Sequence, residues 1–129
     1  MKKINLMDKY PVYTVEIKKS ELIVSTTEEI INFIKEKIEK DPIATFISVF
    51  DHYSHTKDIK WEIDPEIKNA KIILYCFWKA ITNPVMLWVR SRNLAIVEFE
   101  DKFVISFLEA PQEPANEKIQ SWVNNLFIK

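Results

Sequence analysis

Glycine is absent from this chain of 129 residues, although average usage would supply about nine. Glycine gives a backbone access to positive φ angles and lets it approach a ligand closely. Its absence therefore excludes the Walker A loop, the dinucleotide-binding fingerprint, the protein-kinase phosphate loop and the G-x-S-x-G nucleophile elbow. The GXXG clamp of KH domains is excluded in the same way.

Disulfides, long apolar runs and a strong net charge are missing as well. Cys76 is the single cysteine, so no internal disulfide can form and no oxidising compartment is required. The longest uncharged run, Ala80–Val89, is about half as long as a membrane-spanning helix, and the first residues contain no apolar segment of signal-peptide length. The net charge of −1 gives no field that would attract nucleic acid or an anionic membrane. We therefore expect a cytoplasmic protein with no nucleic-acid and no membrane partner.

The composition that remains is that of an ordinary globular protein. Hydrophobic residues make up 47% of the chain and charged residues 29%, close to the usual values for a folded domain. A chain of this length fits one domain, and it contains no internal repeat and no low-complexity segment. We predict a single domain over residues 1–129.

Two amphipathic helices are predicted, one early and one at the C-terminus. In the early helix, about Thr26–Lys40, isoleucines recur every four residues at Ile30, Ile34 and Ile38, and the preceding residues can form a capping box. The late helix, about Ala115–Phe127, has its apolar residues on one side.

Two segments fit a helix and a strand almost equally well. In 43–55, the Asp41-Pro42 pair is a good helix start, whereas the run Thr45–Phe50 is rich in β-branched and aromatic residues. In 71–79, apolar residues follow both helical spacing and a period of two. We predict a buried strand in each, the second preceded by a helical turn at Asp64-Pro65.

The remaining strands are predicted at Val12–Ile17, Val85–Arg90, Leu94–Glu100 and Phe103–Glu109. The last three are joined by the loop 91–93 and by a tight turn at 101–102. Since no glycine is present, Asn93 and Asp101 are expected to have positive φ. These elements predict the α+β class, with a largely antiparallel sheet of about five or six strands covered by the early and the C-terminal helix.

The stretch FDHYSHTKD, residues 50–58, holds both histidines of the chain behind an aspartate. On a helix, His52 and His55 would share one face and could reach one metal ion. On a continuous strand they would point to opposite sides, so the predicted strand argues against such a site, and a bend near Tyr53 would restore it. Asp51, His52 and His55 are candidates for ligand binding or acid–base chemistry, but the simpler explanation is that the histidines are polar groups at a strand end, hydrogen-bonded to the backbone.

Other candidate residues carry weaker signals. Arg90 and Arg92 are the only arginines and flank Ser91, an arrangement that suits an anion fork but also an ordinary surface turn. Cys76 lies among apolar residues, where a thiol is usually inert. The tryptophans and tyrosines have no basic stripe among them, so core and interface packing explains them better than base stacking. No closed metal-ligand pattern and no cofactor motif is present.

Two segments, FDHYSHTK at Phe50–Lys57 and EFEDKFVISFLEAP at Glu98–Pro111, resemble a family of small uncharacterised bacterial proteins, one of the domains of unknown function. The resemblance implies a small stand-alone bacterial domain in the cytoplasm. It assigns no activity, cofactor or residue role.

The absence of catalytic motifs favours a non-enzymatic small domain that binds a partner or a small ligand. The alternative is a metal- or histidine-dependent enzyme that uses Asp51, His52 and His55. We also expect a homodimer, because the run Val85–Val89 has no charged residue on either parity. Either helices bury both of its faces or one face contacts another chain.

Overall fold

The computed structural model describes all residues 1–129 and contains one six-stranded sheet in the order β1-β2-β6-β5-β4-β3, with every neighbouring pair antiparallel. The strands are β1 Lys2–Leu6, β2 Tyr10–Lys18, β3 Ala44–Asp51, β4 Asn69–Phe77, β5 Ser91–Glu98 and β6 Lys102–Leu108. The helices are α1 Thr27–Lys40, α2 His52–Asp58, α3 Leu87–Arg90 and α4 Glu113–Asn124, with a short 3-10 helix, η1, at Lys19–Glu21.

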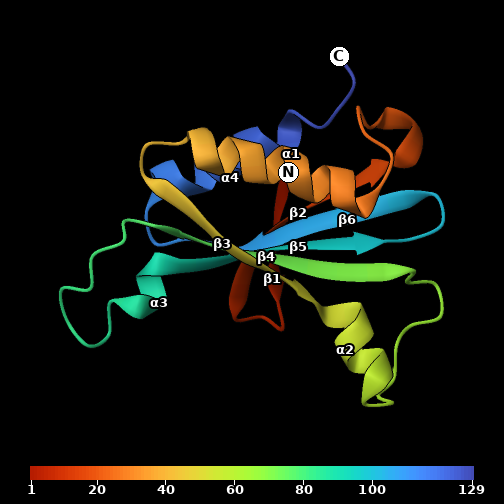
Figure 1. The fold of residues 1–129 in the computed structure, drawn as a ribbon, viewed down its shortest axis with the longest axis horizontal. Helices are drawn as coiled ribbons and strands as arrows, with labels where there is room; N and C mark the ends of the chain where they lie inside the picture. The colour runs from red at the N-terminus through yellow and green to blue at the C-terminus, as the bar shows by residue number, and fades with distance from the viewer.

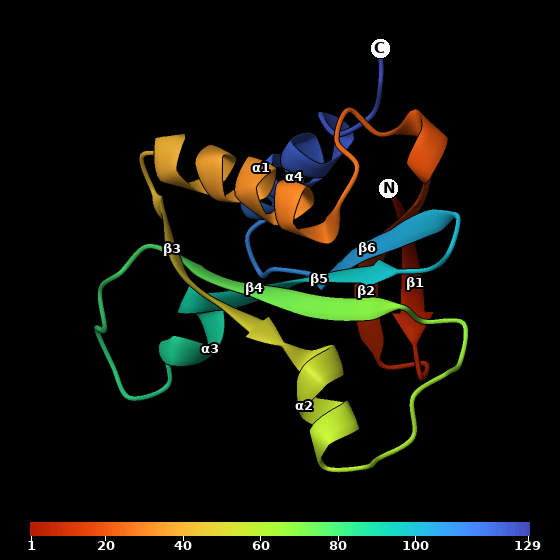
Figure 2. The same cartoon turned by 45° about the vertical axis from the view of Figure 1, so that its right-hand side comes forward.

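The two long helices, α1 and α4, lie side by side over one face of the sheet (Figure 1), which we call the inner face. The turned view shows α2 and α3 on the opposite side, near two ends of the sheet (Figure 2). We call that side the outer face. No helix of the chain is long and apolar enough to cross a membrane.

A single hydrophobic core fills the space between the inner face and the two long helices. From α1, Ile30, Ile34 and Ile38 are fully buried, and the Thr26 side chain caps the helix by accepting a hydrogen bond from the Glu29 N–H. Most of the other core residues come from five strands and from α4: Tyr13, Ile17, Ala44, Ile73, Tyr75, Phe77, Leu94, Ile96, Phe103, Ile105, Phe107, Ala115, Ile119, Trp122 and Val123. Leu22, Ile31, Ala110 and Leu126 complete the core.

The structure confirms the predicted class, the two long helices and a sheet with six strands. Both ambiguous segments are strands, since β3 and β4 occupy most of 43–55 and 71–79. At Asp64-Pro65 the chain makes one turn, closed by a hydrogen bond from the Ile67 N–H to the Asp64 carbonyl, and no helix. Strand β1 and helix α2 were not predicted.

The predicted strand at Val85–Arg90 is wrong. The Asn83 side chain accepts a hydrogen bond from the Val85 N–H at 3.0 Å, which starts a turn, and the run continues into α3. The residues 91–93, predicted as a loop, begin β5 instead.

The expected positive φ at Asn93 and Asp101 is also wrong. Asn93 lies in β5, where the backbone is extended, and the β5–β6 turn closes without a left-handed residue. Positive φ occurs instead at Met7, Asp8, Lys60 and Trp78, and the first two of these form the turn between β1 and β2.

Candidate functional site

The chain bends at Asp51, where β3 ends and α2 begins. The Asp51 carboxylate accepts hydrogen bonds from the Ser54 N–H and the Ser54 hydroxyl, both at 3.0 Å, and so caps the helix. The hydrogen bond from the Ser54 N–H is the main reason that the pKa of Asp51 is lowered from its ordinary value. The predicted strand therefore stops four residues before His55.

The bend places both histidines on one side of α2. Their ring centroids are 6.3 Å apart, and both rings pack against Phe50, at 5.2 Å for His52 and 5.5 Å for His55. His52 Nδ1 lies 3.0 Å from the Thr56 hydroxyl. Both side chains are exposed.

Asp51 does not complete a metal site with these histidines. Its carboxylate is engaged by Ser54, and nowhere in the chain do three or more His, Cys, Asp or Glu side chains gather in a group that could hold a metal ion. Two imidazoles alone leave a structural or catalytic zinc site incomplete. The geometry of this cluster instead suits an apolar or aromatic contact with two hydrogen-bonding rings at its edge.

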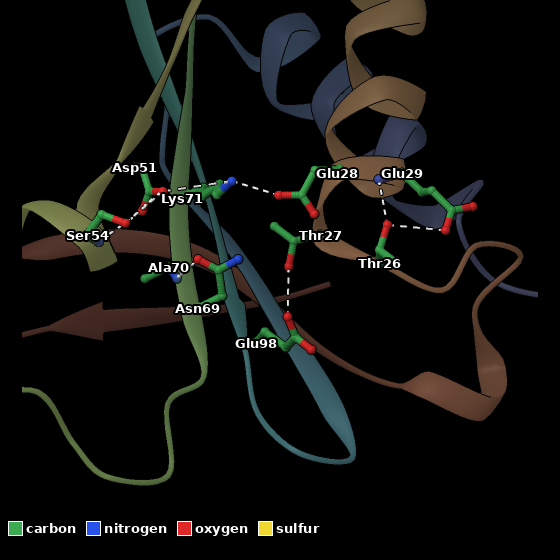
Figure 3. Close-up of polar contacts among 10 residues, drawn as sticks. All are labelled: Thr26, Thr27, Glu28, Glu29, Asp51, Ser54, Asn69, Ala70, Lys71 and Glu98. Atoms are coloured by element: carbon green, nitrogen blue, oxygen red, sulfur yellow. Dashed lines mark hydrogen bonds and ion pairs between the residues drawn. The ribbon is translucent and has the colours of Figure 1, made fainter.

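Beside Asp51, a polar cluster ties the start of α1 to the ends of β3, β4 and β5 (Figure 3). Lys71 Nζ lies 2.7 Å from a Glu28 oxygen and 3.9 Å from an Asp51 oxygen. The hydrogen bond from Lys71 lowers the pKa of Glu28. Because one ammonium lies between two carboxylates that stay ionised, this cluster offers neither a free base nor a raised-pKa acid, and we assign it to the packing of α1.

A second carboxylate of the same region is Glu98, which receives two hydrogen bonds. The buried Thr27 hydroxyl donates to one of its oxygens at 3.0 Å and Lys19 donates to the other at 2.7 Å. Glu98 is thus fully engaged and is unavailable for chemistry.

The two arginines do not form an anion fork. Arg90 Nε donates to the Ala80 carbonyl at 2.7 Å and so holds the loop before α3. Arg92 is only 8% exposed, and its Nη2 donates to the Leu108 carbonyl. The first arginine therefore serves the loop, and only the second has an unusual environment.

Arg92 borders a cavity of about 580 Å³ between α3 and the ends of β5 and β6. Its lining includes the apolar residues Pro84, Leu87, Trp88 and Leu108 and the polar residues Ser91 and Asn93. No sequence signal marked this cavity, because β6 and the α3 segment are distant along the chain.

The outer face of the sheet is another feature that the sequence did not reveal. The strand register puts mainly apolar side chains on it, and none of them is buried. Its central residues are Val12, Thr14 and Glu16 of β2, Val104, Ser106 and Leu108 of β6, Asn93, Ala95 and Val97 of β5, and Ala70, Ile72, Leu74 and Cys76 of β4.

The comparisons with known proteins add a family and no activity. A family described as "Family of unknown function (DUF6858)" matches residues 1–128. No curated protein and no solved structure matches the chain.

Proposed function

Because the chain belongs to the family of unknown function DUF6858, we propose its role from its surface: it is a non-enzymatic binding domain that pairs with a second copy of itself through the outer face. The expected cytoplasmic and bacterial setting is part of this proposal. The observation that carries it is the apolar, uncovered outer face.

The outer face has the apolar composition of a surface from which a bound partner excludes water. Among its central residues only Glu16 is charged, and it is paired with Lys102 at 3.1 Å at one end of the face. A large contiguous apolar patch marks an interaction site in most soluble proteins. An antiparallel sheet whose outer side faces water usually shows mainly polar side chains there, whereas on this face the polar residues Thr14, Glu16, Ser106 and Asn93 are a minority.

The α3 segment extends the apolar surface at one end. Leu87 is 51% exposed and Trp88 is 82% exposed, and the preceding Val85 is exposed too. Tryptophan is enriched among the residues that carry most of the binding energy in protein interfaces. The uncharged run that suggested a dimer is thus solvent-accessible in the single chain.

A second copy of this chain fits the surface better than a charged partner does. Glu16 is the only charged residue among the central residues and is paired with Lys102, so the face carries no free charge that would attract an acidic or basic protein. A two-fold axis is the commonest way for identical surfaces to pair.

Sedimentation equilibrium at micromolar concentration tests the proposal. We expect a species of twice the chain mass of 15.3 kDa. The Val97→Lys substitution should weaken the dimer by at least about 100-fold, because an unpaired ammonium would be buried at its centre. The control Asn32→Lys adds the same charge on exposed α1 and should leave the dimer intact. A mass of one chain at every concentration would overturn the proposal.

A second candidate, a metal- or histidine-dependent enzyme, is favoured by the adjacency of His52 and His55 on α2. Elemental analysis of protein purified without a histidine tag distinguishes it. Stoichiometric zinc, iron or nickel that disappears in the His52→Ala variant would replace the binding proposal with this one.

A further inference from the structure

The two short helices of the outer side, α2 and α3, lie at opposite ends of the sheet (Figure 2). Helix α2 follows the end of β3, where Asp51 pairs with Lys71 of β4, and α3 precedes β5, whose first residue, Ser91, pairs with Cys76 of β4. Along β4, Lys71 and Cys76 are about 17 Å apart. Across the sheet only β4 separates β3 from β5, so those two strands are about 10 Å apart.

Each of these helices carries exposed aromatic surface. On the α2 side, the rings of His52 and His55 lie 6.3 Å apart and both pack on Phe50. Phe50 lies opposite Ile72 on the outer face and is 43% exposed. We call Phe50, His52 and His55 the α2 aromatic cluster. On α3, Trp88 is 82% exposed. An indole ring stacks well on other rings, and its N–H can donate to the acceptor nitrogen of a neutral imidazole, so the two surfaces are complementary.

The two ends of the sheet also differ in charge. The α2 end, residues 51–68, contains five acidic and three basic residues, whereas the α3 end, residues 77–91, contains Lys79 and Arg90 and no acidic residue. Two α3 ends brought together would repel each other, whereas an α3 end beside an α2 end would be attracted to it. Charge complementarity therefore favours contact between opposite ends of two copies of the chain.

Two arrangements have two-fold symmetry when the outer faces of two aligned sheets meet. An axis along the strands places like ends together, so that α3 lies at the α3 end of the partner subunit. An axis across the strands places α3 of one copy at the α2 end of the other. The lateral distance between these helices is then that between β5 and β3, about 10 Å, which is an ordinary spacing of packed helices. Only the second arrangement brings together the opposite charges and the two aromatic surfaces.

We propose that the two copies pair about a two-fold axis across the strands, so that Trp88 of each copy packs on the α2 aromatic cluster of the partner subunit. This inference rests on the proposed outer-face dimer and specifies its arrangement. By symmetry the contact forms twice in each dimer. Tryptophan is among the residues that contribute most to the free energy of association when a partner covers them.

Site-directed cross-linking tests the arrangement while Trp88 and the cluster stay in place. In a Cys76→Ser chain, Val85→Cys introduces a thiol at the α3 end and Ile59→Cys introduces one at the α2 end. Both native side chains are exposed, so the substitutions are compatible with folding. With a short bismaleimide, the chain that carries both new cysteines should give a cross-linked dimer, and neither single-cysteine chain should. A cross-linked dimer of the Val85→Cys chain alone would indicate the axis along the strands and overturn the inference.

Sedimentation equilibrium of the same chains separates failure of this inference from failure of the proposed dimer. Addition of Val97→Lys to the chain with both new cysteines should abolish the cross-link, because it weakens the association. The mass of one chain and no cross-link in any variant would overturn the proposed dimer together with the inference. The mass of two chains without a cross-link in the chain with both cysteines would overturn the inference alone.

Truncation of the two aromatic surfaces tests the contact itself. Trp88→Ala should weaken the dimer about 10-fold or more, and His55→Ala should weaken it about 3-fold or more. Once Trp88 is removed, His55→Ala should have little further effect, because the two residues act through one contact. The control Ile128→Ala truncates an exposed residue on the helix-covered side of the sheet (Figure 1) and should leave the dimer unchanged. Fully additive losses in the Trp88→Ala, His55→Ala chain would contradict the inference.

Discussion

The two faces of the sheet are made by the same strands from similar residue types, yet only one of them is covered. In β4, Ile73 points to the inner face and is fully buried, whereas Ile72, the next residue, points to the outer face and remains partly exposed. In β6, Ile105 and Val104 differ in the same way. Residue type alone therefore does not decide which side of a strand stabilises the fold, because the helices supply the cover.

The two faces also differ in where their polar groups lie. On the inner side, charged groups are held at the rim by α1, as in the contacts of Lys71 with Glu28 and of Glu98 with Thr27. On the outer side, no helix spans the centre, and apolar side chains face solvent there. Burial of the inner face thus stabilises the fold, and we infer that the apolar residues of the outer face serve binding.

The largest expected effect comes from truncating the two neighbouring isoleucines of β4. Ile73→Ala should lower the free energy of unfolding by about 2–5 kcal/mol, because it removes buried methyl groups and leaves a cavity. Ile72→Ala should lower it by less, about 1–2 kcal/mol, because this side chain remains partly exposed and its truncation leaves no closed cavity. Urea unfolding, followed by circular dichroism, measures both.

The monomeric Val97→Lys background is the right one for this pair, since a dimer would add its own stability to the folded state. Equal losses for the two variants would break the comparison, because they would mean that the outer face is covered within one chain. In the natural background, Ile72→Ala should instead weaken the dimer.

A smaller effect is expected from Asp41 at the C-terminal end of α1, whose side chain links α1 to the start of β3 and to α4. Its carboxylate accepts hydrogen bonds from the Ile43 and Ala44 N–H groups at 2.9 and 3.0 Å and pairs with Lys118 of α4 at 2.8 Å. Burial alone would raise the pKa of Asp41, but the Lys118 contact and the two backbone hydrogen bonds outweigh it and lower the pKa.

Because the pKa of Asp41 is lower in the folded state, its contribution is complete above the ordinary value of 3.8 and is lost as the pH falls through the folded value. Asp41→Ala should therefore cost about 1–3 kcal/mol at pH 7 and reduce the loss of stability as the pH falls below the ordinary value of 3.8. Urea unfolding at a series of pH values gives both numbers. A variant with the same acid sensitivity as the natural chain would exclude Asp41 as a source of it.

The sequence was informative where one pattern had one structural meaning. The four-residue spacing of Ile30, Ile34 and Ile38, with a capping threonine before it, predicted α1 nearly to its ends. The runs in 43–55 and 71–79 also fitted a helix, and the enrichment in β-branched and aromatic residues and the period-two apolar face correctly favoured β3 and β4. The short, fully exposed β1 was missed because its apolar alternation is limited to Ile4 and Leu6 and the strand depends on pairing with β2.

The candidate sites were less predictable, because they depend on contacts between distant segments. The Asp51 cap that starts α2 could have been recognised from the serine three residues later, but the apolar run before it favoured a continuing strand. The run Val85–Val89 was wrongly predicted as part of a strand, because a lack of charged residues does not distinguish a buried strand from an exposed segment. The environment of Arg92, including its hydrogen bond to the Leu108 carbonyl, depends on where β6 lies. No pattern in the sequence around Arg92 predicts that position.

The smallest expected effect lies on the outer side, in the histidines of α2. His52 and His55 are exposed, and the Phe50 ring on which they pack is 43% exposed itself. His52→Ala loses a solvent-exposed contact with Thr56 and gains helix propensity of less than about 1 kcal/mol, so the free energy of unfolding should change by less than about 0.5 kcal/mol. His55→Ala should behave in the same way. Urea unfolding at pH 7 measures both variants beside Ile73→Ala as the buried reference.

A loss above about 1 kcal/mol would show that α2 belongs to the stabilising layer and would break the division between the two faces. A change within 0.5 kcal/mol would leave these rings free to be tested for binding alone, because any loss of metal content or ligand affinity in the same variants could then not be attributed to unfolding.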